Sequence, residues 1–131
     1  MTIYLAIKYH PDLRKRELVE TILRGLESAH HTPLFALRDL ENWGEVSLSP
    51  RELMHKSFAL IDAADLVLIE LSEKGVGLGI EAGYAHARAK PIITLARGGS
   101  DISMTLRGIS AEVFFYESSM DLEKILLGLE L

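Results

Sequence analysis

Two nearly continuous apolar runs constrain the fold more than any other feature of this chain. They are Leu66 to Leu71 (LVLIEL) and Pro91 to Ala96 (PIITLA). Branched apolar residues at successive positions, without polar alternation, are typical of parallel strands that helices cover on both faces. The proline is compatible with a strand because it stands first in its run. We therefore expect two central strands of a parallel sheet.

Three shorter apolar runs predict further strands, and the segments between strands predict helices. The strands are expected at Ile3 to Ile7, Leu34 to Leu37 and Glu112 to Tyr116, and the longest loop at residues 39–49. Apolar residues spaced three to four apart predict an amphipathic helix from Leu13 to His30, after a stop and cap at Pro11 and Asp12.

Capping signals place the remaining helices. Ser49-Pro50-Arg51-Glu52 is a capping box with proline at the first helical position, and it predicts a helix that ends near Ala64. A glycine-rich turn, SEKGVGLG, is expected before a helix over IEAGYAHARAK. Asp101 is expected to cap a short helix through Leu106, and Ser118 a terminal one.

Five strands that alternate with helices imply an α/β fold: a doubly wound, Rossmann-like or flavodoxin-like, five-stranded parallel sheet. The crossovers are long enough for right-handed βαβ units. The 131 residues can bury one substantial core but not two, so we expect a single domain over residues 1–131.

Composition excludes several functional classes. The formal net charge is −5, from 14 Lys+Arg against 19 Asp+Glu, which argues against a nucleic-acid or anionic-membrane surface. The chain has no cysteine, so disulfides and thiolate metal sites are excluded and the cytoplasm is the expected location. The histidines are adjacent or isolated, so we expect no metal and no cofactor.

The loop after the first central strand is the best candidate for chemistry. In open parallel sheets, ligands bind beyond the carboxyl ends of the strands. Gly75, Gly77 and Gly79 leave backbone N–H groups open to a ligand. Glu81 follows in what we expect to be the first turn of the next helix, where the dipole favours an ionised carboxylate. Such a carboxylate is either a nucleophile or merely a charge that helps the helix to start.

The segment GVGLGIEAGYAHARAKPIITL resembles the signature of the nucleoside 2-deoxyribosyltransferases, including the 2′-deoxynucleoside 5′-phosphate N-hydrolases. The resemblance extends to residues 64–68, 103–108 and 2–5. It implies that Glu81 attacks the anomeric carbon of a nucleoside or its 5′-monophosphate and forms a covalent glycosyl-enzyme. Water then releases the sugar, whereas a second base yields a new nucleoside. The same resemblance implies a homodimer or a dimer of dimers.

The resemblance also suggests substrate-binding residues, and it shows two departures. Ser57 stands where the family places an Asp, and Gly75 where it places an Asp or a Ser. Ser103 matches a phosphate-contacting serine that the family draws from a neighbouring subunit. Tyr4 and Tyr84 are candidates for stacking on a base or a sugar.

Other functions stay open at this point. Trp43 could cover the pocket from the long loop. A nucleotide-binding module that has lost catalysis with the Asp is the main alternative. A phosphoribohydrolase of the lysine-decarboxylase-like fold ranks lower because the Pro-Gly-Gly before the glycine turn is absent. A phosphoacceptor receiver needs acidic residues where Lys8, Tyr9 and His10 stand.

Overall fold

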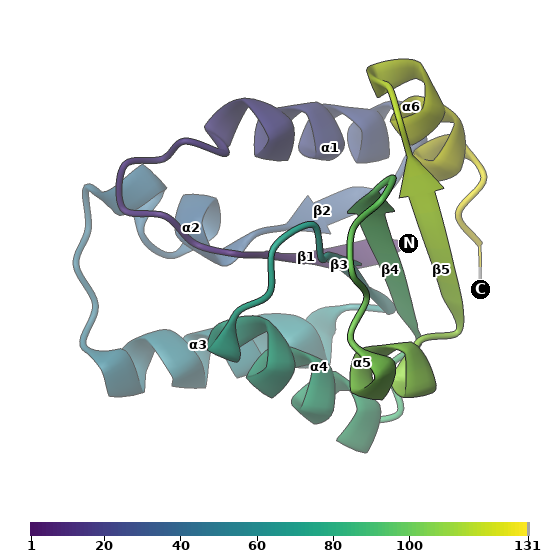
Figure 1. Ribbon diagram of the computed structural model, residues 1–131. Helices are drawn as coiled ribbons and strands as arrows, with labels where there is room; N and C mark the ends of the chain where they lie inside the picture. The colour runs from purple at the N-terminus through teal and green to yellow at the C-terminus, as the bar shows by residue number, and fades with distance from the viewer. Residues whose placement is uncertain (131) are drawn as a thin grey trace.

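The protein is a three-layer α/β molecule, seen here in a computed structural model that describes residues 1–130 (Figure 1). Its central sheet has five parallel strands in the order β2-β1-β3-β4-β5. This arrangement confirms the predicted doubly wound fold. The strands are β1 (Thr2–Ile7), β2 (Thr32–Leu34), β3 (Leu66–Glu70), β4 (Ile92–Arg97) and β5 (Glu112–Tyr116).

Helices cover both faces of this sheet. Figure 1 shows α1 and α6 on one face, and α3, α4 and α5 on the other. The helices are α1 (Arg16–Ser28), α2 (Ala36–Asp39), α3 (Pro50–Ala63), α4 (Val76–Ala87), α5 (Met104–Ile109) and α6 (Ser119–Leu127), with a 3-10 turn η1 (Asn42–Gly44). No helix within residues 1–130 combines the length and the apolar character that crossing a bilayer requires.

Alternation along the strands divides the core in two. In β3, Leu68 packs into the cluster under α1 and α6, whereas Val67 and Ile69 pack into the cluster under α3 and α4. Every residue of β3 is buried. This explains the unbroken apolar run, because a strand covered on both faces has no position that favours a polar side chain.

Two serine capping signals predicted helix starts correctly. The Ser49 hydroxyl accepts a hydrogen bond from the backbone N–H of Glu52 at 3.2 Å, and α3 begins at Pro50 as expected. Ser118 and Asp121 form a reciprocal capping box at the start of α6. Both serine predictions were correct because the capping side chain satisfies backbone groups only a few residues away.

The first part of the chain differs from the prediction. Helix α1 begins at Arg16 rather than Leu13, which adopts a left-handed φ of 55°, and Asp12 accepts from the Arg14 N–H instead of capping the helix. Strand β2 is Thr32–Leu34 rather than Leu34 to Leu37. The run beyond Leu34 turns into α2 instead, where the Asp39 carboxylate accepts from the Phe35 N–H at 2.8 Å.

Two helices near the expected site also start elsewhere. Helix α4 begins at Val76, so Gly77 and Gly79 lie within the helix, and Glu81 is in its second turn rather than its first. Burial of Leu78 and Ala82 against the sheet offsets the low helix propensity of the glycines. Helix α5 begins at Met104, and the Asp101 that was expected to cap it instead pairs with Lys74.

Candidate active site

A cavity of about 360 Å³ lies over the carboxyl end of β1. Four parts of the chain form its walls: β1 with the loop that follows it, the start of α1, the segment from Phe35 to Trp43, and the facing sides of α3 and α4. We call it the Glu81 pocket. Of the residues predicted from sequence, it brings together Tyr4, Ser57, Gly75, Gly77 and Glu81.

Glu81 supplies a carboxyl group to this pocket from the second turn of α4. The side chain is largely withdrawn from water, and burial raises the pKa of Glu81 from 4.5 to about 7, because a carboxylate loses solvation there. The group is therefore close to half ionised at neutral pH. A carboxyl with a pKa near the working pH, in a pocket, is typical of a catalytic site.

Tyr4 lies beside Glu81 at the floor of the pocket. The Tyr4 hydroxyl lowers the pKa of Glu81, against the larger effect of burial. Burial, and then the negative charge of Glu81, raise the pKa of Tyr4 itself, while the Ser57 side chain lowers it. Ser57 is buried on α3. Tyr4, Ser57 and Glu81 thus place three polar side chains together in the lining of the pocket.

Lys8 also lines the Glu81 pocket and brings a positive charge to it. A Cβ at Gly75 would meet the Lys8 side chain, 2.8 Å from Cδ and 3.5 Å from Nζ. The glycine therefore provides the space in which Lys8 lies across the start of α4. Within residues 1–130, Lys8 forms no ion pair, so its ammonium group is free to meet an anionic ligand.

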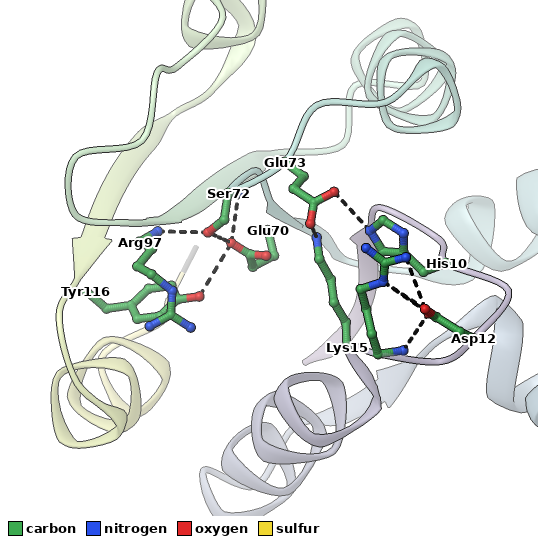
Figure 2. Close-up of polar contacts among 9 residues, drawn as sticks. His10, Asp12, Lys15, Glu70, Ser72, Glu73, Arg97 and Tyr116 are labelled. Atoms are coloured by element: carbon green, nitrogen blue, oxygen red, sulfur yellow. Dashed lines mark hydrogen bonds and ion pairs between the residues drawn. The ribbon is translucent and has the colours of Figure 1, made fainter.

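Two further basic side chains of the pocket are already paired. Figure 2 shows Glu73 between them: His10 Nε2 lies 2.9 Å from Oε2, and Lys15 Nζ lies 3.2 Å from Oε1. Lys15 and then His10 hold the pKa of Glu73 below its usual value, against some desolvation. This bridge ties the loop after β1 to the loop after β3 and so fixes two edges of the pocket.

The segment between β2 and α3 supplies an aromatic wall. Trp43 adopts a left-handed φ of 58° and packs near Phe35, with a ring-centroid distance of 5.9 Å, while the Arg16 guanidinium lies 4.2 Å from its ring centroid. Trp43 lines the Glu81 pocket, where the sequence suggested a cover. Glu41 lines it too and is the second carboxylate of the cavity.

Three residues predicted to bind substrate lie outside the lining of this pocket. Tyr84 stacks on Phe58 at 4.1 Å and donates to Asp62 at 2.8 Å, so its hydroxyl already has a partner on α3. Gly79 has open space beside it. The Ser103 hydroxyl bonds that of Thr105 at 2.8 Å, and its proposed contact across a subunit interface stays a prediction.

Sequence reasoning missed several lining residues, among them Lys15, Arg16 and Glu41. They carry no motif, and only the three-dimensional meeting of distant segments identifies them. Lys15 and Glu73 are 58 positions apart in the chain, and an isolated charge in a loop is usually solvated. Within residues 1–130, no group of three or more His, Asp or Glu side chains is arranged to hold a metal ion.

Comparison with known proteins gives consistent results. The model of the family described as nucleoside 2-deoxyribosyltransferase matches residues 3–119. A putative 2′-deoxynucleoside 5′-phosphate N-hydrolase from Thermofilum pendens is 29% identical over 99% of this chain and 93% of its own length.

Solved structures of low identity share the fold. A CMP N-glycosidase from Clostridium botulinum has a TM-score of 0.72 and 20% identity, over 98% of this chain and 100% of that one. A 2-deoxyribosyltransferase from Bacillus psychrosaccharolyticus has a TM-score of 0.70 and 20% identity, over 94% and 90%.

Proposed function

Because the chain belongs to the nucleoside 2-deoxyribosyltransferase family, we propose that it hydrolyses the N-glycosidic bond of a nucleoside 5′-monophosphate, with Glu81 as the nucleophile. The observation that carries this proposal is the placement of two groups in one pocket. The Glu81 carboxyl lies against Tyr4, and the unpaired ammonium of Lys8 lies across Gly75. A reactive carboxylate and an anion-binding group are what such a substrate requires.

The proposed reaction has two steps. The ionised Glu81 carboxylate attacks C1′ of the sugar, the C1′–N bond breaks, and its electron pair leaves with the base, which takes a proton from water. The resulting glycosyl ester is then attacked at C1′ by water, which releases the sugar phosphate and regenerates Glu81. This is the double displacement of retaining glycosidases. Tyr4 would orient the carboxylate and favour its ionised form.

Hydrolysis is favoured over transfer to a second base for two reasons. The relative from Thermofilum pendens, which aligns with 99% of this chain, is named as an N-hydrolase. In addition, Gly75 leaves the start of α4 without the Asp that the transferases carry there, and the space beside it is filled by Lys8. A cation in this position suits a phosphate better than it suits a neutral nucleoside.

The test is base release from a panel of nucleosides and their 5′-monophosphates, followed by chromatography. We expect release from at least one 5′-monophosphate, and a loss of several orders of magnitude in Glu81→Ala, as is typical when a covalent catalyst is removed. Glu123→Ala, at an exposed position of α6, is the matched control and should keep full activity. Folded Glu81→Ala protein with wild-type base release would exclude the mechanism, and a wild type that releases no base would favour the binding-module alternative.

A further inference from the structure

Strand β3 ends in a buried carboxyl group that the proposed reaction does not use. Glu70 is fully buried, with a relative exposure of 0%. Ile69 belongs to the cluster under α3 and α4, so alternation turns Glu70 toward the opposite face of the sheet, where it meets Tyr116. It does not line the Glu81 pocket.

Only one oxygen of this carboxyl group has hydrogen-bond partners. Oε1 accepts from the Ser72 backbone N–H at 2.9 Å and from the Ser72 hydroxyl, with the Tyr116 hydroxyl at 3.5 Å (Figure 2). Oε2 is buried and has no hydrogen-bond partner within residues 1–130. An unpartnered buried carboxylate oxygen is costly, and native proteins almost always satisfy such groups. This oxygen can therefore still accept a hydrogen bond from a donor outside the chain.

Glu70 lines a second cavity, of about 500 Å³, which we call the Glu70 pocket. The start of α1 and the loops after β3 and β4 surround it. Two of its cations are already paired, Arg14 with Asp12 and Lys15 with Glu73.

Arg97 differs from these paired cations. Its guanidinium lies 5.4 Å from the centroid of the Tyr116 ring and forms no ion pair with any described residue. The nearby Glu117 side chain lies over Gly98 and is exposed. The Glu70 pocket thus has a buried carboxyl group in its wall and, at its exposed side, a guanidinium group that no described residue pairs with.

We propose that the Glu70 pocket binds a small molecule that carries both an amino group and an anionic group. The amine donates to Glu70 Oε2, and the carboxylate or phosphate of the ligand meets the Arg97 guanidinium. Both contacts are charge-assisted hydrogen bonds, and guanidinium is suited to planar carboxylate and to phosphate. Amino acids and nucleotides with an exocyclic amino group share this chemistry. The site is separate from the Glu81 pocket, although Lys15 lines both.

Binding can be measured without reference to catalysis, by NMR titration of the full chain while the backbone amides of residues 98–100 are followed. Glycine, β-alanine and 4-aminobutyrate vary the spacing between amine and carboxylate. Cytidine and uridine 5′-monophosphates, added to Glu81→Gln protein to prevent turnover, differ in whether the base carries an amino group. We expect saturable shifts with at least one amine-bearing probe, and none with uridine 5′-monophosphate. Binding of one of the three amino acids would identify an amino acid as the ligand, and binding of cytidine 5′-monophosphate would identify a nucleotide.

Variants assign the contacts. Glu70→Gln places an NH₂ donor where Oε2 accepts, and Arg97→Ala removes the cation at an exposed position where folding should be unaffected. We expect each to weaken binding at least about tenfold, the loss of one charge-assisted contact. Glu112→Gln, at an exposed position of β5, should bind as wild type does. The absence of saturable shifts with every probe at about 10 mM, or undiminished binding in Arg97→Ala, would overturn the proposal.

Discussion

Replacing Glu81 by glutamine should stabilise the protein at pH 8 and leave its stability nearly unchanged at pH 4. Burial raises the pKa of Glu81 in the folded protein to about 7, against 4.5 for an ordinary Glu. Between these values the folded protein retains a proton that the unfolded chain has lost. The free energy of unfolding therefore falls as pH rises from about 4.5 to about 7, and a neutral glutamine removes this loss.

The size of the effect follows from the two pKa values. Their difference is about 2.5 units, and each unit corresponds to about 1.4 kcal/mol, which gives an upper limit of about 3 to 4 kcal/mol. Since Glu81 lines a cavity that is open to solvent, we expect about 2 kcal/mol at pH 8 after some discount for hydration. Glutamine has nearly the shape of glutamate, and its carbonyl can accept a hydrogen bond from the Tyr4 hydroxyl.

Urea denaturation of wild type and Glu81→Gln at pH 4, 6 and 8, followed by circular dichroism, measures this difference. The free energy of unfolding of Glu81→Gln should exceed that of the wild type by an amount that grows from pH 4 to pH 8. Glu123→Gln, at an exposed position, is the control for loss of a surface charge and should show no such trend. A difference between wild type and Glu81→Gln that is the same at all three pH values would show that the pKa of Glu81 is not raised in the folded protein.

Three further predictions concern catalysis and assembly. Tyr4→Phe should move the acidic limb of the pH–rate profile upward by about one unit, because the Tyr4 hydroxyl lowers the pKa of Glu81, and an unchanged limb would contradict this role. In steady-state kinetics, Lys8→Ala should raise KM for a 5′-monophosphate about tenfold and leave KM for the parent nucleoside unchanged. Equal increases in both KM values would exclude a phosphate contact. Light scattering should show a homodimer or a dimer of dimers, because Val76, Ile80 and Met104 expose apolar surface on α4 and α5. Ile80→Glu should weaken this assembly. A wild-type monomer at micromolar concentration would count against the prediction.

The sequence was most informative where a structural signal is local. The Ser49 cap and the Ser118 capping box were predicted because the bonded groups lie within three residues of each other. The unbroken run of β3 identified a central strand, because burial on both faces removes polar alternation. Glu81 was singled out by its place after the glycine-rich turn, and the family resemblance then suggested its role as nucleophile.

The parts that failed depend on tertiary contacts. The start of α4 was misplaced because glycine weakens a helix locally, whereas the burial of Leu78 against the sheet, which offsets this cost, is not visible in the sequence. The contact between Lys8 and Gly75 joins positions far apart in the chain. Tyr84 shares a helix with Glu81, but Asp62 and Phe58 draw its ring toward α3. None of these contacts could be predicted from residues that are neighbours in the sequence.

The role of Glu81 as nucleophile is tested most directly by the stereochemistry of the reaction. When a nucleoside 5′-monophosphate is cleaved in aqueous methanol, proton NMR reports the anomeric configuration of the methyl glycoside that first forms. Attack by Glu81 followed by methanol inverts C1′ twice, so the account predicts that the β configuration of the substrate is retained. An α-methyl glycoside as the first product would mean that methanol attacks the substrate in a single displacement, and it would contradict a covalent intermediate on Glu81.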